Sequence, residues 1–226
     1  MKHSDYLIIV AGGAGSRMKS ETPKQFLKIN GVPILVLAIK QFLSVNPEIK
    51  IVIAVHKNYI KHLLSLTKKY FNNKNIFIVV GGDTRFQSVK NALQILPNSK
   101  EVVAIHDAAR PFVSKKVIDN CINTARIKGN ATPAVDLAES IRVVDKNKNK
   151  AVNRSNYKII QTPQCFVLDQ LKKAFAKKYS PKFTDDASVF ESAGNKINLV
   201  EGNTENIKIT NPSDLIIAKA FVKHDK

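Results

Sequence analysis

The sequence has 226 residues, of which 44% are hydrophobic and 24% are charged. This composition is typical of a globular protein and excludes general disorder, collagen and coiled coils. A chain of this length can bury enough surface to fold without disulfides or a metal ion. We therefore expect one domain over residues 1–226.

The chain is strongly basic, with 36 lysines and arginines against 18 acidic residues and a formal charge of +18. Such an excess can indicate nucleic acid, an anionic membrane or acidic small substrates. Only six of the 36 are arginines, and the lysines are spread along the chain without the interleaved aromatic residues of a base-stacking surface. We expect neither nucleic acid nor a membrane as partner. A basic nucleic-acid-binding protein is the alternative from a different class, and it predicts strongly salt-dependent binding.

From residue 6 onward, short apolar runs alternate with segments of helical periodicity. Strands are predicted over 6–11, 49–55, 75–80, 102–106, 131–135 and 197–200. Helices are predicted over 34–45, 57–71, 84–96, 114–128, 168–178, 185–194 and 212–222. The strands are apolar almost throughout, as in a sheet that is covered on both faces. The pattern predicts a doubly wound α/β fold with a mostly parallel sheet, the Rossmann-like arrangement.

Residues 138–161 interrupt this alternation. Two β-rich pieces, 140–144 and 157–160, flank the very polar segment 145–156. We expect a hairpin arm that protrudes from the main sheet, because its tip has nothing apolar to pack. Such an arm serves a partner subunit or acts as a lid, or it is a plain surface excursion.

Neither the cysteines nor the apolar runs point to secretion. Cys121 and Cys165 are too few for a disulfide framework or a zinc site. We expect two buried thiols in a reducing compartment. No apolar run approaches the ~18 residues that suggest a membrane span, and no secretory signal is recognisable. We expect a cytoplasmic protein.

The run Ala11-Gly12-Gly13-Ala14-Gly15 follows the first predicted strand. Glycines let backbone N–H groups approach a phosphate chain without interference from a Cβ atom. The dinucleotide fingerprint fails because Met18 stands where its third small residue belongs, and the Gly-Lys-Ser/Thr of a Walker loop is absent. A tight strand-to-helix turn is the structural alternative.

Two cations lie in and just after this loop, Arg17 and Lys24, on either side of Pro23. Arg offers a planar fork to phosphate oxygens, and Lys offers a compact point charge. Together they suit a polyphosphate. A solvated pair of surface cations is the alternative.

Two further motifs follow predicted strands, so all three can border one crevice at the carboxyl ends of the sheet. The first contains Gly82, Asp83 and Ser88, where Asp83 could also merely cap the next helix. The second is His106-Asp107-Ala108-Ala109-Arg110. A carboxylate beside a polyphosphate is a natural Mg²⁺ ligand, although Asp107 could instead simply pair with Arg110. We expect His106 to be a satisfied, buried side chain rather than a catalyst.

These motifs resemble those of the nucleotidyltransferase family and, within it, of the 2-C-methyl-D-erythritol 4-phosphate cytidylyltransferases. The similarity continues through Arg154, Thr162-Pro163-Gln164, the run from Thr184 to Ala187 and the run from Asn206 to Thr210. It implies transfer of the cytidylyl group of CTP to the polyol phosphate, with release of pyrophosphate. The alternative is a ribitol-5-phosphate cytidylyltransferase, whose acceptor differs little in charge or size.

The resemblance also implies a role for each site residue. Arg17, Lys24, Arg154 and Lys208 would be catalytic. The nucleotide would be held by Ala11, Gly12, Gly13, Ala14, Gly15, Gly82, Asp83 and Ser88. The acceptor would be held by Asp107, Ser140, Arg154, Thr162, Thr184 and Lys208. Asp107 would also bind Mg²⁺, for which Mn²⁺ could substitute. The family is a homodimer whose arm reaches the partner's site, which would make Arg154 act in trans.

Overall fold

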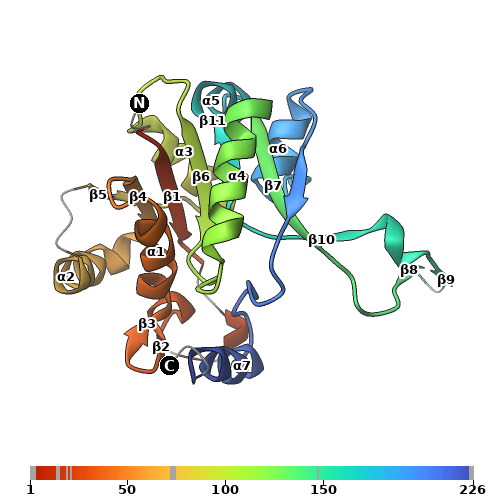
Figure 1. The fold of residues 1–226 in the computed structure, drawn as a ribbon, viewed down its shortest axis with the longest axis horizontal. Coiled ribbons are helices and arrows are strands. Elements are labelled where there is room, and N and C mark those ends of the chain that lie inside the picture. The colour runs from red at the N-terminus through yellow and green to blue at the C-terminus, as the bar shows by residue number, and fades with distance from the viewer. Residues whose placement is uncertain are drawn as a thin grey trace.

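An eight-stranded sheet forms the centre of the molecule (Figure 1). The computed structural model describes residues 4–13, 16–18, 20, 22–71, 75–146 and 148–223. Seven strands follow one another in the order β10-β7-β11-β6-β1-β4-β5, and β12 pairs with β7. Their bounds are β1 (Tyr6–Ala11), β4 (Lys50–Val55), β5 (Ile76–Val80), β6 (Val102–Asp107), β7 (Asn130–Asp136), β10 (Lys158–Ile160), β11 (Gln164–Val167) and β12 (Leu199–Glu201).

Six of these strands run in one direction, and only β10 and β11 run against them. The prediction of a mostly parallel α/β sheet is thus confirmed. The β11 strand was not predicted, because its four residues merge in the sequence with the apolar start of the helix that follows. The six strands that were predicted for the sheet are all present, and their observed ends differ from the predicted ends by up to two residues.

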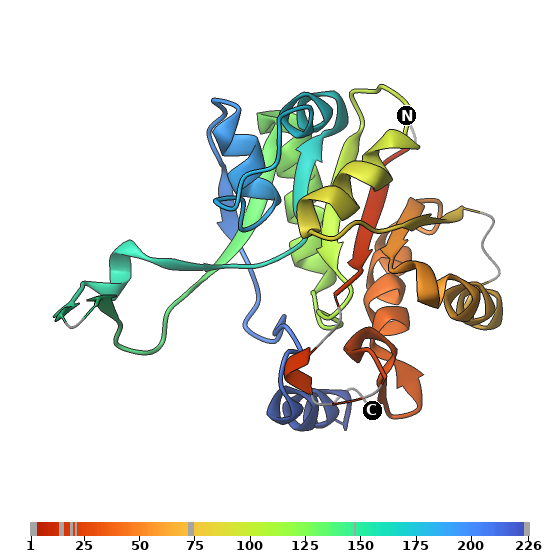
Figure 2. The same ribbon diagram turned by 180° about the vertical axis from the view of Figure 1, so that it is seen from behind.

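Helices cover both faces of the sheet (Figures 1 and 2). One face carries α1 (Ile34–Val45), α2 (Ile60–Tyr70) and α4 (Lys115–Lys128), whose apolar side chains form one core cluster with the sheet. The other carries α3 (Arg85–Gln94), α5 (Leu168–Phe175) and α6 (Asp186–Ser192), which form the second. The central strands β1, β4 and β6 are buried from both sides, which explains why their sequences are almost entirely apolar.

Below the sheet in Figure 1, α7 (Pro212–Lys223) packs near a small hairpin of β2 (Lys28–Ile29) and β3 (Val32–Pro33). The turn of this hairpin, Asn30-Gly31, has positive φ angles of 48° and 83°, the conformation that such two-residue turns require. Across the described ranges, no helix combines the length and apolar character needed to cross a bilayer.

The arm lies far from the body of the sheet, as predicted, but its strands pair differently (Figure 2). The hairpin consists of β8 (Arg142–Asp145) and β9 (Lys148–Ala151). The prediction that 140–144 pairs with 157–160 is wrong, because β10 instead pairs with β7 in the main sheet. The polar sequence of β9 carried no strand signal, whereas its backbone completes the ladder of β8.

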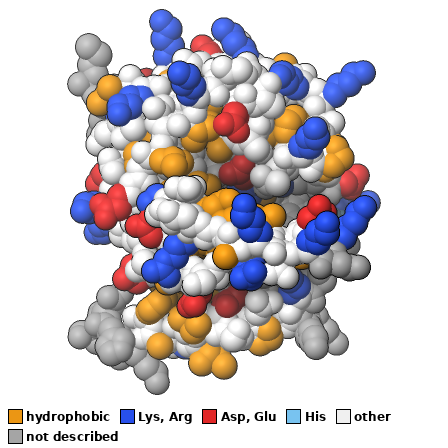
Figure 3. Space-filling model, turned by 90° about the vertical axis from the view of Figure 1, so that its right-hand side faces the viewer, with side chains coloured by type: hydrophobic (Ala, Val, Ile, Leu, Met, Phe, Trp, Pro, Cys, Tyr) orange, Lys and Arg blue, Asp and Glu red, His pale blue; other side chains and the backbone are white. Residues whose placement is uncertain are grey.

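Apolar and charged side chains mix on the arm's side of the molecule (Figure 3). On this face lysines and arginines are scattered among acidic and apolar groups rather than gathered into one stripe. The arm and its base expose several large apolar side chains, among them Val143, Val144, Tyr157, Ile159, Ile160 and Leu199.

Candidate active site

A pocket lies where the segments after β1, β5 and β6 meet. Residues 10–13 line it from β1, residues 82–85 and Ser88 from the start of α3, and residues 107–109 from β6. Lys24 and Lys208 complete its wall. The three strand-end motifs therefore converge as expected for parallel strands.

The glycine loop borders this pocket through Gly12 and Gly13. Ala11, which precedes them, is the buried last residue of β1, and its carbonyl accepts a hydrogen bond of 2.7 Å from the side-chain amide of Gln25. Ala14 and Gly15, also predicted to bind the nucleotide, lie outside the described residues. Through its hydrogen bond to Ala11, the buried Gln25 links the short helix η2 (Lys24–Phe26) to the glycine loop.

Lys24 begins η2 and its side chain faces the pocket. Burial lowers the pKa of its amine, and the positive charges of Lys208 and Arg17 lower it further. Arg17 lies in the short helix η1 (Ser16–Met18) and is exposed. Three predicted cations therefore act on one another across the same space, which is how a site for a highly charged anion is built.

Ser88 organises the turn that follows β5. Its oxygen accepts a hydrogen bond from the N–H of Gly82 at 3.1 Å, and its hydroxyl donates to the carbonyl of Thr84 at 2.9 Å. Gly82 has no room for a side chain, because a Cβ atom there would lie 2.1 Å from Cγ of Gln87. The helix cap is Thr84 and not Asp83, since the Thr84 hydroxyl accepts from the N–H of Gln87. Asp83 is left exposed at the pocket.

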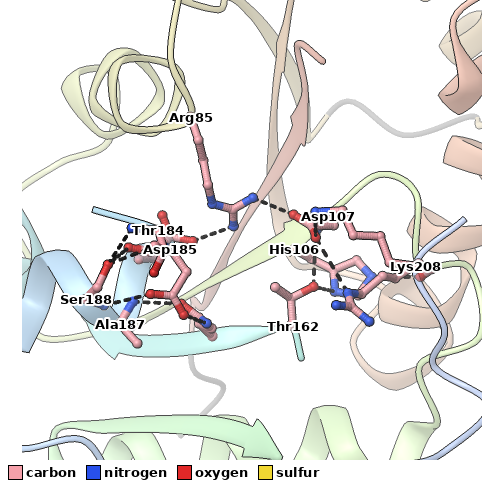
Figure 4. A network of polar contacts seen from close by, with 12 residues as sticks. Arg85, His106, Asp107, Thr162, Thr184, Asp185, Ala187, Ser188 and Lys208 are labelled. Carbon is pink, nitrogen blue, oxygen red and sulfur yellow. Dashed lines mark hydrogen bonds and ion pairs between the residues drawn. The ribbon is translucent and has the colours of Figure 1, made fainter. Parts of the chain in front are cut away.

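Asp107 stands at the centre of a cluster of cations (Figure 4). Its Oδ1 pairs with Arg85, while its Oδ2 lies 2.9 Å from Nζ of Lys208 and 3.5 Å from Nε of Arg110. Arg85 also holds the buried Asp186, at 2.5 Å. The pairing of Asp107 with Arg110, considered above as the alternative to a metal ligand, is present, and at 3.5 Å it is the longest of the three contacts.

Charge and burial oppose each other in this cluster. Burial alone would raise the pKa of Asp107, but Arg85, Lys208 and Arg110 hold it well below its usual range. Burial raises the pKa of Asp186, although Arg85 opposes this. Asp107 is therefore ionised near neutral pH.

His106 is fully buried against Phe42, with ring centroids 5.0 Å apart. Burial lowers the pKa of its imidazole to about 4, so the ring is neutral near pH 7. Its Nδ1 lies 3.0 Å from the hydroxyl of Thr162, and its Nε2 lies 2.9 Å from the carbonyl of Arg110. The prediction of a satisfied, buried histidine is confirmed.

Among the described residues, five predicted site residues do not line this pocket: Arg17, Ser140, Arg154, Thr162 and Thr184. Ser140 and Arg154 are exposed on the arm, where Arg154 donates to the carbonyl of Ala138. Thr184 is exposed just before α6, on the far side of Arg85 from Lys208 (Figure 4). Thr162 is buried close to Asp107, whose N–H donates to its hydroxyl at 3.1 Å.

Arg85 and Asp186 contact the site but were not predicted to belong to it. Their pairing spans 101 positions in sequence, and no periodicity connects them. One signal was available, since Arg85 is one of only six arginines in a lysine-rich chain. An arginine in the first turn of a helix also opposes the helix dipole, so it requires another reason to be there.

The donor set fits a metal ion that brings most of its own ligands. Within the described ranges, no three His, Cys, Asp or Glu residues are grouped so as to hold one. The pocket offers the carboxylates of Asp83 and Asp107, and both oxygens of Asp107 already face cations. Mg²⁺ commonly takes one or two carboxylates and otherwise phosphate oxygens and waters. The site thus suits a Mg²⁺ ion that arrives on a polyphosphate.

Comparisons with known proteins agree with this geometry. The family model described as IspD, 2-C-methyl-D-erythritol 4-phosphate cytidylyltransferase, matches residues 6–224. An enzyme of that name from Bacteroides fragilis is 42% identical over 215 residues, covering 95% of this chain and 98% of the relative. One from Clostridium acetobutylicum is 40% identical over 221 residues, covering 96% of each.

Solved structures give the same result. The Francisella tularensis 2-C-methyl-D-erythritol 4-phosphate cytidylyltransferase superimposes with a TM-score of 0.79 at 35% identity, over 96% of this chain and 99% of that one. The 4-diphosphocytidyl-2C-methyl-D-erythritol synthase of Anaerococcus prevotii gives a TM-score of 0.83 at 28% identity, covering 98% and 97%. With its strand-end pocket, its cation cluster and these relatives, the chain belongs to the 2-C-methyl-D-erythritol 4-phosphate cytidylyltransferase family.

Proposed function

We propose that this protein transfers the cytidylyl group of CTP to 2-C-methyl-D-erythritol 4-phosphate, with release of pyrophosphate. The observation that carries the proposal is the pocket itself, in which a glycine loop faces Lys24, Lys208 and the ionised Asp107. Two polyanionic substrates require such a concentration of positive charge, and a polyol requires a fixed hydrogen-bond acceptor beside it.

The nucleotide belongs on the side of the pocket formed by the loops after β1 and β5. The backbone from Ala11 to Gly15 and the turn of Gly82, Asp83 and Ser88 would hold the cytidine and its phosphates. Gly82 lets this turn form, because a Cβ atom there would clash with Gln87, and the turn lines the pocket. Ser88 then acts chiefly by fixing the turn, since its hydroxyl is already committed to Thr84.

The transfer needs no general base. The acceptor's phosphate monoester is mostly dianionic near pH 7, because its second pKa is about 6. One of its oxygens attacks the α-phosphorus of CTP, a new P–O bond forms, and the bond to the β-phosphate breaks in line. Arg17 and Lys24 stabilise the charge on the pentavalent transition state, and pyrophosphate leaves with the electron pair.

The acceptor belongs on the side of Asp107, Thr162 and Lys208. Lys208 would position its phosphate. Ser140, Arg154 and Thr184 would complete this side of the site, and of these Ser140 and Arg154 are on the arm. We propose a homodimer in which the arm of one subunit delivers Arg154 to the pocket of the other. The apolar side chains exposed along the arm support this, since a partner would remove them from water.

Mg²⁺ is the proposed cofactor, with Mn²⁺ as a possible substitute. When bound, the ion would neutralise phosphate charge, and Asp107 would be its protein ligand. We also propose a cytoplasmic location. The two cysteines are buried free thiols, which suits a reducing compartment.

The test is pyrophosphate release from CTP in the presence of Mg²⁺, with methylerythritol phosphate and ribitol 5-phosphate as parallel acceptors. We expect release with the first acceptor alone and its loss when EDTA replaces the metal. Release with ribitol 5-phosphate alone would assign the protein to a different acceptor on the same fold. No release with either acceptor would overturn the proposed function.

A further inference from the structure

A closed ring of hydrogen bonds lies behind the carboxylate of Asp107. It joins His106, Arg110, Asn206 and Thr162, which come from three segments far apart in the sequence. His106 contacts the carbonyl of Arg110, whose Nη1 donates to the carbonyl of Asn206 at 2.7 Å. The side-chain amide of Asn206 donates to the carbonyl of Thr162 at 2.8 Å, and Thr162 returns the chain to His106.

The partners of His106 determine which ring nitrogen carries the hydrogen, and so which group donates in each of its hydrogen bonds. A carbonyl only accepts, so Nε2 must carry the hydrogen that reaches Arg110. A neutral imidazole has one such hydrogen, so Nδ1 is bare and accepts from the hydroxyl of Thr162. The oxygen of that hydroxyl accepts in turn from the N–H of Asp107. No other tautomer satisfies all three contacts. His106 thereby holds Arg110 directly and Asp107 through Thr162, at the two ends of the turn 107–110.

Asn206 performs the same task for the loop that carries Lys208. Its side chain is fully buried, and its amide also reaches Oε1 of Gln161 at 3.4 Å. Its own Oδ1 is buried and has no partner among the described residues, which indicates that the residue is kept for the direction of its donors. Two residues further on, Lys208 meets Oδ2 of Asp107, the oxygen that also faces Arg110.

The ring acts on one half of the pocket only. None of its four members lines the pocket wall. The ring touches Asp107 directly through Thr162. It reaches Lys208 only through Asp107 and through Asn206, which lies two positions before Lys208, and it reaches Arg85 only through Asp107. No contact described for the ring touches Gly12, Gly13 or the turn that begins at Gly82.

We infer that His106 and Asn206 are positioning residues that hold Asp107, Arg110 and Lys208 in one fixed arrangement and so set the affinity for the acceptor rather than for CTP. The inference rests on the proposed function, because it uses the acceptor side defined there. If these residues had a merely structural role, their substitution would lower the affinity for both substrates equally and would also lower the stability of the fold.

Three substitutions each remove a defined part of the ring. His106→Asn keeps an acceptor for Thr162 but loses the donor to Arg110, and His106→Gln does the reverse. Asn206→Asp replaces the donor with an oxygen that faces the carbonyl of Thr162. The matched control is Asn130→Asp, the same change at a buried asparagine that holds residues 196 and 198 instead. The readouts are KM for each substrate, kcat and Tm.

We expect His106→Asn and His106→Gln to raise KM for the acceptor roughly 5- to 10-fold, and Asn206→Asp roughly 10- to 100-fold. KM for CTP should change less than about twofold, which is smaller than the change expected when one hydrogen bond to a substrate is lost. Asn130→Asp should lower Tm without separating the two KM values. Either of two results would overturn the inference: both KM values rise together, or KM for the acceptor stays unchanged. If wild-type protein in the same assay turns over neither acceptor, the proposed function itself fails.

Discussion

The residues at the strand ends and those on the arm belong to opposite environments. Asp107 is buried, and three cations from three segments hold it. Arg154 is exposed, and its described hydrogen bond is to the carbonyl of nearby Ala138. The pocket residues are therefore organised by this chain alone, whereas the arm residues have only local contacts. The proposed site is therefore complete only where the arm meets a second surface.

The largest effect that separates the two regions should be on stability. Arg85→Ala leaves the buried carboxylates of Asp107 and Asp186 without their shared cation, and breaking a buried pair costs about 3–5 kcal/mol of unfolding free energy. The control is Lys158→Ala, which breaks the ion pair with Asp136 at the base of the arm. Both partners are exposed there, so the loss should stay below about 1 kcal/mol. Urea denaturation measures both, and similar losses would contradict the contrast.

The second prediction concerns activity. Lys24→Ala should lower kcat by about 10²–10³, the usual effect of removing one electrostatic donor from a transition state. We expect Arg154→Ala to be comparably inactive. The matched control is Lys61→Ala, an exposed lysine on α2 away from the pocket. Turnover near the wild-type rate in either site variant would remove that residue from the proposed mechanism.

Mixing these two inactive variants sharpens the comparison further. If Arg154 acts in trans, a dimer of one subunit of each kind contains one intact site. After subunit exchange, a one-to-one mixture should then recover roughly one quarter of wild-type turnover. If Arg154 serves its own subunit, every site carries a substitution and the mixture stays inactive.

The final prediction concerns the pH dependence of stability that His106 imposes. Its pKa is about 4 in the folded protein and 6.5 when unfolded, so only the unfolded chain binds the proton between these values. The unfolding free energy should therefore fall as the pH drops from 6.5 to 4, by about 3 kcal/mol in total. Above pH 6.5 this contribution is constant.

The comparison for this test is His106→Asn, whose stability should lack this slope in urea titrations between pH 7.5 and 5. The raised pKa of Asp186 has the opposite sign, because the folded protein then binds the extra proton, and it cancels in the difference between the two proteins. Parallel curves for the two proteins would show that the buried imidazole does not control this range.

The sheet and the pocket motifs were predictable because local signals define them. Continuous apolar runs mark strands buried on both sides, and the turns that follow β1, β5 and β6 carry glycine or a carboxylate. The pairing of β10 with β7 was not predictable. The apolar residues Ile159 and Ile160 fit a strand of the arm hairpin as well as a strand of the main sheet. The contact of Arg85 with Asp186 was not predictable either, because long-range ion pairs have no sequence period.

The occupied state of Asp107 has a consequence for inhibitor design. Its carboxylate pairs with Lys208, Arg85 and Arg110, so these three cations already have an anionic partner within the chain. A neutral compound that enters the pocket gains little from them and must compete with an ion pair in place. Effective inhibitors of this site should therefore carry an anionic group, or avoid the acceptor side and bind the turn at Gly82.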